Sequence, residues 1–372
     1  MTADAPTQIE VEDVPCPLCG SDGHSLRLES FDMLYDVPGT YRIVRCRQCR
    51  HLFMNPQPTL KSLPLCYPDG YGPHETVFTS NPDLASVDLP LQDEPAASGE
   101  LHSAVDSTRQ PTHRSPWYLS SIVRSIPGVK SLYHWLADNR SEHIPTPQTD
   151  DSRAIELGCA TGKYLTKLRD AGWEAEGVEL VESAAKESRR SGFQVHVGTL
   201  ESANLAANSY DGAFAWHVLE HLPDPKASLA EFHRVLKDDG WLALSIPNVS
   251  CWEPVVFGQM WYLWDMPRHL HFWGPFSIRQ LLVETGFHEI RVIHQRTLLN
   301  VVGSLALCLK HRWPQSRLTK KLVDYPNHPT MWWQLLLAPA AIFLAMIHQG
   351  GRLTVIARCQ KPKTYNATTS KS

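Results

Sequence analysis

The sequence predicts an α/β fold built on a mostly parallel, seven-stranded sheet with helices on both faces. Two observations lead to this prediction. Short apolar runs alternate with helical patterns across residues 151–297, and a glycine-bearing turn joins the first run to the first helical pattern. Two Cys-x-x-Cys pairs upstream of this region predict a separate small module. The 372 residues are enough for several structural units around a sizeable core.

Composition narrows the class of protein. Apolar residues make up 42% and charged residues 20% of the chain, which is ordinary for a globular protein, and the net charge of −4 argues against nucleic acid as the main partner. The N-terminal stretch MTADAPTQIEVEDVP lacks the basic and apolar segments of a secretory signal. We therefore expect a cytoplasmic protein whose nine cysteines are thiols or thiolates rather than disulfides.

Changes in composition divide the chain into five expected segments. These are a cysteine-bearing head at 1–75, a linker with a helical lead-in at 76–150, the α/β core at 151–297, an apolar helical insert at 298–350, and a last strand with a polar tail at 351–372.

The core elements are expected in the order strand, helix, strand. Strands are predicted at 154–157, up to 179, at 194–197, 211–216, 241–246, 289–293 and 352–357, and helices at 162–171, after 179, at 226–236 and at 277–285. Gly286 follows the last of these helices, where a left-handed residue ends a helix well.

The turn after the first core strand has the composition of a ligand-binding turn. It reads Glu156-Leu157-Gly158-Cys159-Ala160-Thr161-Gly162, and its glycines allow the backbone to approach a ligand closely. Glu179 closes the next strand, where a carboxylate can accept hydrogen bonds from a ribose diol. Ala160 occupies the middle glycine position of the dinucleotide fingerprint, so an NAD-dependent oxidoreductase fits poorly.

Four motifs in order carry a family resemblance. After the turn come Tyr210-Asp211-Gly212-Ala213-Phe214, then Val218-Leu219-Glu220-His221, then Phe232-His233-Arg234-Val235-Leu236-Lys237 with Gly240-Trp241-Leu242. The region 151–297 thereby resembles the class I methyltransferases that use S-adenosylmethionine (SAM), with Ala160 where that family usually has glycine.

The resemblance implies a cofactor site. By it, the methionine part of SAM is surrounded by Glu156, Gly158, Ala160 and Gly162, the ribose is held by Glu179, the adenine is bordered by Leu200 and Glu201, and the methyl group faces His217. The alternative is that the glycines only form a tight turn and that Glu179 is a solvated strand end.

The two cysteine pairs predict a structural zinc site. A gap longer than the common zinc-site spacing separates Cys16 and Cys19 from Cys46 and Cys49, but it suits a hairpin between two turns, as in zinc ribbons. Four thiolates complete a closed tetrahedral site. The alternatives are two unrelated pairs or a redox dithiol.

The head also carries a resemblance of its own. The stretch that begins at Cys49 is similar to the zinc-binding head of a bacterial methyltransferase group, whose layout some deoxysugar C-methyltransferases share. That group usually has glycine where this chain has Arg50.

Histidines and a glutamate gather at the expected carboxyl edge of the sheet. His217, Glu220 and His221 follow one strand, and His269 and His271 lie downstream, where substrates bind in such folds. Three interpretations stay open. One of these side chains, with His217, Glu220, His221 and His271 as the catalytic candidates, deprotonates or contacts the acceptor. The group instead binds a metal, as the similar Glu-x-x-Glu-His site of small-RNA 2′-O-methyltransferases does. In the third interpretation, Glu220 and His221 only form hydrogen bonds within this carboxyl edge of the sheet, the rim.

The C-terminal third contains two apolar runs. Residues 298–309 and 331–347 are expected to form helices that cover the core, to touch a membrane or a lipid-linked substrate at its interface, or to form a dimer surface. The second run is short for a membrane span, and 352–357 must return to the sheet.

Together these features predict methyl transfer from SAM to a small-molecule acceptor, with sugars and glycolipid precursors as candidates. The alternatives are a zinc-ribbon scaffold protein with a vestigial SAM fold, and a methyltransferase that acts on RNA or protein.

Overall fold

A seven-stranded sheet forms the centre of the computed structural model, which describes residues 8–67, 145–326 and 329–362. The strand order is β12-β13-β10-β9-β6-β7-β8. All neighbours from β10 to β8 are parallel, and β13 is antiparallel to both of its neighbours. The strands are β6 (Arg153–Leu157), β7 (Glu174–Glu179), β8 (Gln194–Val197), β9 (Tyr210–Trp216), β10 (Leu236–Pro247), β12 (Phe287–His294) and β13 (Arg352–Cys359). The predicted seven-stranded, mostly parallel sheet is confirmed, and the predicted strand at 352–357 returns to it as β13.

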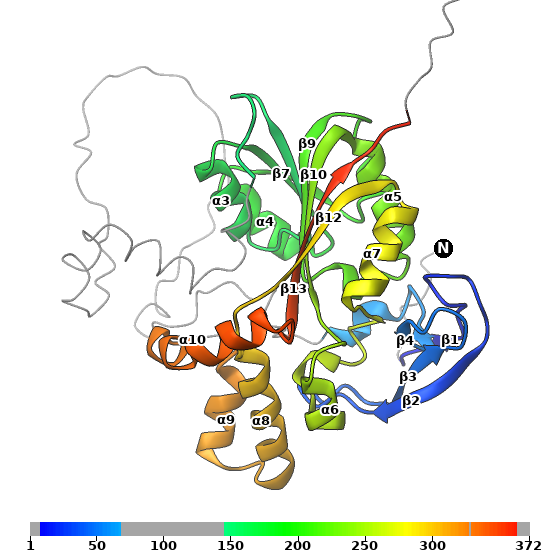
Figure 1. Cartoon of the computed structure of the whole chain (residues 1–372), viewed down its shortest axis with the longest axis vertical. Helices are drawn as coiled ribbons and strands as arrows, with labels where there is room; N and C mark the ends of the chain where they lie inside the picture. The colour runs from blue at the N-terminus through cyan, green and yellow to red at the C-terminus, as the bar shows by residue number, and fades with distance from the viewer. Residues whose placement is uncertain (1–7, 68–144, 327–328, 363–372) are drawn as a thin grey trace, which may run out of the picture. The chain divides into compact units, whose positions relative to one another are not determined.

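Helices cover both faces of this sheet, as predicted. Figure 1 shows α3 (Lys163–Asp170) and α4 (Glu182–Arg190) on one side and α5 (Pro225–Val235) and α7 (Pro275–Glu284) on the other. Local chemistry sets the helix ends. The Asp224 side chain accepts a hydrogen bond from the Ala227 N–H at 2.9 Å before α5, and Gly286 has a φ of 90° after α7.

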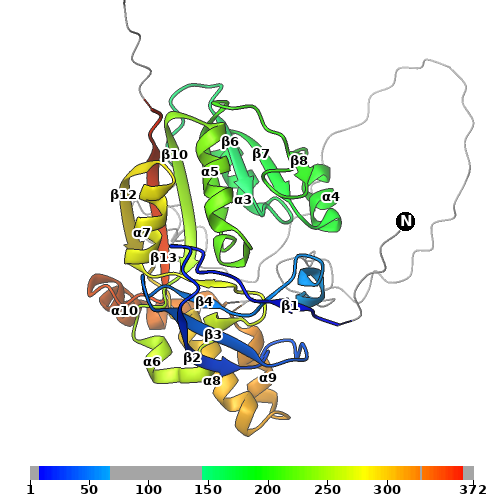
Figure 2. The same cartoon turned by 90° about the vertical axis from the view of Figure 1, so that its right-hand side faces the viewer.

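The N-terminal head carries two small sheets. They contain β1 (Val11–Glu12), β2 (His24–Ser30), β3 (Tyr41–Cys46), β4 (Leu52–Met54) and β5 (Gln57–Pro58), and the short helix η1 (Leu63–Cys66) follows. The four-stranded sheet has the order β11-β4-β3-β2, and β11 (His271–Phe272) comes from the core region, far downstream in the chain. A strand from the core region therefore completes the sheet of the head. Figure 2 shows β2, β3 and β4 of that sheet side by side.

A buried ion group also joins the head to the core. The Arg268 guanidinium donates to both carboxylate oxygens of Asp32, at 2.8 and 2.9 Å, and to Asp265 at 2.7 Å. Arg268 has no exposed surface and Asp32 is 2% exposed. Nearby, the His51 ring packs on Trp273 with 4.4 Å between ring centroids. Because buried charges persist only when they are paired, these contacts link the two regions tightly.

The described part of the apolar insert contains three helices rather than the two that the sequence predicts. These are α8 (Leu299–Arg312), α9 (Arg317–Asp324) and α10 (Met331–Met346). The two predicted runs form α8 and α10. The short helix α9 is mostly polar, so apolar content gave no sign of it. Before the insert, α6 (Glu253–Phe257), η6 (Gly258–Met260) and η7 (Tyr262–Trp264) lie between β10 and β11.

Within the described ranges, none of the helices combines the length and the apolar content that crossing a membrane requires. Most of the predicted linker at 76–150 lies outside the described residues.

Candidate functional site

The turn after β6 approaches the loop after β9 very closely. Gly158 has a φ of 70°, and a Cβ atom added to it would lie 2.5 Å from the Val218 side chain. Gly162 has a φ of 79°, and an added Cβ would lie 2.5 Å from Ser188 Oγ. Ala160 shares this left-handed conformation, with a φ of 46°. Glycine is thus required at two of the three positions, both for conformation and for space.

Glu179 is anchored against this turn. Its Oε2 accepts a hydrogen bond from the Ala160 N–H at 2.8 Å, and its Oε1 accepts one from the Val181 N–H at 2.9 Å. The residue is 4% exposed. Each carboxylate oxygen has a second lone pair, so an orientated Glu179 can still accept hydrogen bonds from a diol. This geometry argues against a solvated strand end.

The other predicted cofactor residues occupy different environments. Glu156 is 3% exposed and lies in register between Gly177 of β7 and Phe214 of β9, at the centre of the sheet. Leu200 is 1% exposed and packs in the main hydrophobic cluster. Glu201 is exposed and accepts a hydrogen bond from Ser228 Oγ of α5 at 2.7 Å.

His217 lies at the end of β9 within a hydrogen-bonded chain of side chains. Its Nδ1 lies 3.2 Å from Glu220 Oε1 and its Nε2 lies 3.1 Å from Ser245 Oγ. Gln295 Nε2 donates to the same Ser245 Oγ at 2.8 Å. Both ring nitrogens of His217 are engaged, so it can take a proton from an acceptor only if one of these hydrogen bonds opens. Burial raises the pKa of Glu220 to about 8.

His221 faces the second histidine segment. Its Nδ1 lies 3.0 Å from the Arg268 carbonyl oxygen and 3.1 Å from the Tyr67 hydroxyl. Its ring meets that of His269 edge to face, with centroids 4.6 Å apart. Burial lowers the pKa of His221 to about 3, so its ring is neutral near pH 7. The rim therefore brings His217, Glu220, His221 and His269 together.

His271 is not brought into this group. It lies in β11, opposite Phe53 of β4, and is 1% exposed. Its Nε2 lies 2.9 Å from the Leu222 carbonyl oxygen, and its ring packs near those of His51 and Trp273. Burial lowers its pKa to about 4. This environment is that of a residue between head and core, which weakens the prediction of a direct catalytic role.

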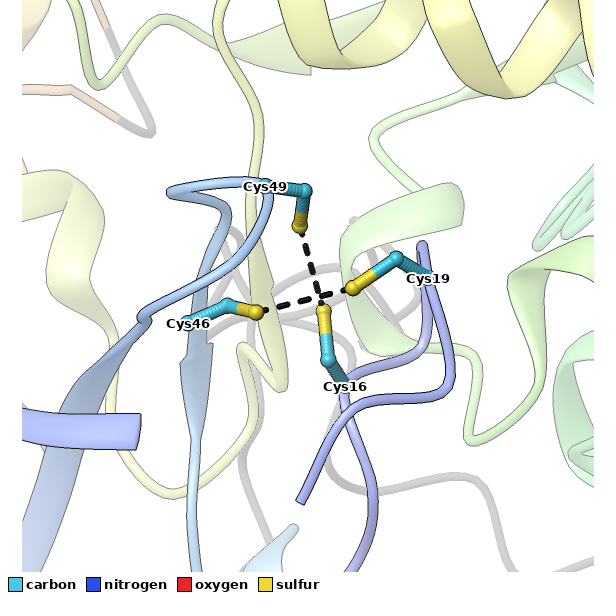
Figure 3. A group of neighbouring side chains, drawn as sticks. All are labelled: Cys16, Cys19, Cys46 and Cys49. Atoms are coloured by element: carbon cyan, nitrogen blue, oxygen red, sulfur yellow. Dashed lines mark hydrogen bonds between the residues drawn. The ribbon is translucent and has the colours of Figure 1, made fainter. Parts of the chain in front are cut away.

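Four cysteine thiols of the head converge on one point (Figure 3). Cys16 Sγ lies 3.5 Å from Cys49 Sγ, and Cys19 Sγ lies 3.5 Å from Cys46 Sγ. Zn–S bonds of about 2.3 Å at tetrahedral angles place sulfur atoms about 3.8 Å apart. The four thiols therefore fit a tetrahedral zinc ion, with little adjustment.

Two matching backbone turns present these thiols. The Gly20 N–H donates to the Cys16 carbonyl at 2.8 Å, and the Arg50 N–H donates to the Cys46 carbonyl at 3.1 Å. Gly20 and Arg50 share a left-handed φ, of 71° and 66°. Arg50 thus adopts the conformation that favours glycine, which explains why glycine suits this position.

Several residues of the site have no sequence signal of their own. Ser245 and Gln295 reach His217 from β10 and from the residue after β12, and Asp32 and Asp265 meet at Arg268. Each is a common polar residue outside any motif, and only the fold brings it to the site.

Comparison with known proteins agrees with the sheet and the turn described above. A family model described as a methyltransferase domain matches residues 130–292, under half of the chain. These matches support a class I SAM-dependent methyltransferase domain over residues 130–292. The prediction made from the motifs between Glu156 and Trp241 is thereby confirmed.

The curated proteins similar to this chain include ubiquinone biosynthesis O-methyltransferases. The one from Thiobacillus denitrificans is 27% identical over 133 residues, which cover 33% of this chain and 57% of the relative. The one from Methylococcus capsulatus is 31% identical over 134 residues, which cover 33% of this chain and 56% of the relative. The matched part thus spans little more than half the length of these relatives.

Solved structures of SAM-dependent methyltransferases are also similar. One from Thermotoga maritima has 18% identity and a TM-score of 0.41 and covers 61% of this chain and 89% of its own. One from Archaeoglobus fulgidus has 19% identity and a TM-score of 0.37 and covers 56% of this chain and 86% of its own. The fold assignment therefore depends on the strand order of this chain itself.

Proposed function

We propose that this methyltransferase moves the methyl group of SAM to an oxygen atom of a small-molecule acceptor bound at the His217 rim. The observation that carries the proposal is the close approach of Gly158 to Val218, which leaves the cofactor turn and the rim side by side. A methyl donor held on the turn would therefore present its reactive end to an acceptor at the rim. Transfer from a sulfonium depends mainly on such in-line positioning.

In this proposal SAM is held by the turn from Glu156 to Gly162 and by Glu179. The methionine part lies along Gly158, Ala160 and Gly162, and the anchored Glu179 carboxylate accepts from the ribose hydroxyls. Leu200 and Glu201 border the adenine, although the hydrogen bond from Ser228 to Glu201 must then orient or release that carboxylate.

The nature of the acceptor is inferred from two sources. The relatives are named as O-methyltransferases, which favours an oxygen nucleophile. The similarity of the head to that of deoxysugar methyltransferases keeps sugars and glycolipid precursors as candidate acceptors. His217 would contact the acceptor or take its proton, with Glu220 and Ser245 setting the orientation of the ring.

Calorimetric titration with SAM tests the cofactor site. Glu179→Ala should weaken SAM binding about 10- to 100-fold, because two charge-assisted hydrogen bonds are lost. The matched control is Glu182→Ala, which removes an exposed carboxylate from the start of α4 and should leave SAM affinity unchanged. If wild-type protein fails to bind SAM at high micromolar concentration, the scaffold interpretation gains and the proposed activity fails.

The role of His217 is tested by turnover rather than by binding. His217→Asn should retain SAM affinity and lose part of the rate with a changed pH profile, because asparagine cannot accept a proton near neutral pH. A rate that stays unchanged across pH would rule out His217 as the base.

A second proposal is that the insert meets a membrane surface or a lipid-linked substrate. On α10, Trp333, Leu336, Phe343 and Met346 are 57%, 66%, 60% and 74% exposed. The helix α9, which precedes α10 in the chain, carries exposed basic residues, Arg317, Lys320 and Lys321. An insert that exposes aromatic and apolar side chains on one helix and cations on another suits an anionic lipid interface.

Vesicle sedimentation tests this second proposal. Wild-type protein should sediment with vesicles that contain phosphatidylglycerol and much less with neutral vesicles. Trp333→Ser together with Phe343→Ser should abolish the difference, whereas Val255→Ser, which removes a 79% exposed apolar residue from α6, should not. Equal sedimentation of all variants would contradict the proposal.

A further inference from the structure

Three side chains converge on one buried point at the rim, away from the cysteines. Glu220 and His221 follow β9, and His269 lies in the loop between η7 and β11. Their ligand atoms lie within 4.8 Å of one another. Glu220 has no exposed surface and His269 is 6% exposed. Burying a carboxylate beside two imidazoles costs free energy unless something satisfies all three.

The hydrogen bonds of the two histidines indicate which nitrogen of each ring is left with a lone pair for a ligand. Nδ1 of His221 lies 3.0 Å from the Arg268 carbonyl oxygen, and Nδ1 of His269 lies 2.9 Å from the Leu263 carbonyl oxygen. A carbonyl only accepts, so Nδ1 carries the hydrogen in both rings and Nε2 presents a lone pair. Metal-bound histidines are held in this way, with the second nitrogen donating to a backbone carbonyl.

Carboxylate oxygens face those lone pairs. Glu220 uses Oε1 towards His217, while its buried Oε2 has no hydrogen-bond partner in the described part of the chain. Asp265 uses Oδ1 to accept from Arg268, and its Oδ2 lies 3.8 Å from His269 Nε2. Where the Glu220 and Asp265 carboxyls are ionised, their oxygens and these lone pairs repel one another. A cation between them would turn that repulsion into attraction.

We propose that Glu220, His221 and His269 bind a divalent transition-metal ion, with Asp265 in reach as a further ligand. Two neutral imidazoles with one or two carboxylates suit Zn²⁺, Mn²⁺ or Fe²⁺. This set differs from the one that the sequence indicated, since His271 lies elsewhere and His217 supports Glu220 instead of binding. The inference rests on the proposed function in one respect: the ion would hold the acceptor oxygen as an added ligand beside the cofactor turn.

Metal content per chain tests the site without any activity measurement. Protein equilibrated with Zn²⁺ and then freed of excess metal should hold two ions. One should lie at the rim and one in the cysteine centre, formed by Cys16, Cys19, Cys46 and Cys49. His269→Gln and Glu220→Gln should each hold one. His271→Gln, which alters a buried histidine outside the cluster, should keep two. One ion in the wild type, lost with Cys46→Ser, would overturn the proposal.

Manganese titration covers the case in which a rim variant folds poorly. Mn²⁺ disfavours thiolates and should leave zinc in the cysteine centre. Wild-type protein that holds zinc in the cysteine centre alone should bind one Mn²⁺, as measured by the paramagnetic resonance signal of free Mn²⁺. Glu220→Gln in the same state should bind it at least about tenfold more weakly. Wild type with zinc at both sites should bind no Mn²⁺, because the rim is then occupied. If wild type binds neither metal at the rim while SAM binds normally, the metal site fails and the methyltransferase proposal stands.

Discussion

The cysteine centre and the Glu220 cluster bring ligands together in different ways. The cysteines lie in two short turns of one small module, and local backbone hydrogen bonds in each turn place two thiols. The rim side chains Glu220, His221 and His269 come from two segments that are far apart in the chain, and the carbonyls of Leu263 and Arg268 orient the two imidazoles. Local geometry thus specifies the first group. The second exists only when the head, β9 and the segment before β11 have packed.

The two regions also meet physically. Arg268 precedes His269 in the chain, supplies its own carbonyl to His221, and uses its guanidinium to bind Asp32 of the head. A substitution in the head at this contact should therefore weaken metal binding at the rim. A substitution at the rim should leave zinc binding by the cysteine turns unchanged. The following predictions test this asymmetry.

The largest effect is expected at the cysteine centre. Cys46→Ser should lose the zinc ion and unfold the head, because structural zinc contributes on the order of 10 kcal/mol to folding in small modules. Metal analysis and chemical unfolding would measure both losses. The control is Cys308→Ser in α8, a partly buried cysteine outside the group. Full zinc content in Cys46→Ser would show that the four cysteines do not act as one site.

The second-largest loss of stability is expected from the Asp32–Arg268 ion pair, which joins the head to the core. Asp32→Ala leaves the buried Arg268 guanidinium with Asp265 as its remaining carboxylate partner, and breaking a buried pair costs about 3–5 kcal/mol. The free energy of unfolding would measure this loss. Glu29→Ala removes the exposed partner of Arg42 on the head and should cost less than about 1 kcal/mol.

Asp32→Ala should also reach the rim in the folded protein. Because Arg268 positions the carbonyl that orients His221, binding of Mn²⁺ should weaken although no proposed ligand has changed. Zinc in the cysteine centre should stay bound. Unchanged Mn²⁺ binding in a destabilised Asp32→Ala protein would show that the rim is independent of the head.

The smallest effect distinguishes the two cysteine turns from each other. Arg50→Gly should stabilise the protein by about 0.5–1 kcal/mol, because a left-handed φ strains an arginine and does not strain glycine. Gly20→Ala should destabilise by about 1 kcal/mol for the converse reason. Thermal unfolding of the zinc-loaded protein would measure both. The changes in stability of the two variants should have opposite signs. If both variants are stabilised, or both destabilised, the left-handed φ does not determine the effect.

Local sequence patterns were enough to predict the sheet and the two cysteine turns. Period and turn chemistry are local, so the strands near Glu156 and Glu179 and the helix stop at Gly286 could be predicted within a few residues. The spacing of Cys16 with Cys19, and of Cys46 with Cys49, already specifies two turns that present pairs of thiols. The unpredicted helix α9 shows the limit, because its mostly polar sequence lacks the apolar content that marked its two neighbours.

Which of the rim residues lie close together depends on long-range packing. The sequence placed both His269 and His271 with His217, Glu220 and His221. In the structure β11 pairs with the head and buries His271 there, while His269 lies with Glu220 and His221. The side chains of His269 and His271 do not point to the same face as residues i and i+2 of one strand would, because His269 lies in the loop before β11. The physical reason is that burial and long-range pairing, here through Arg268 and Asp32, set the direction of each side chain, and neither is visible in the local sequence.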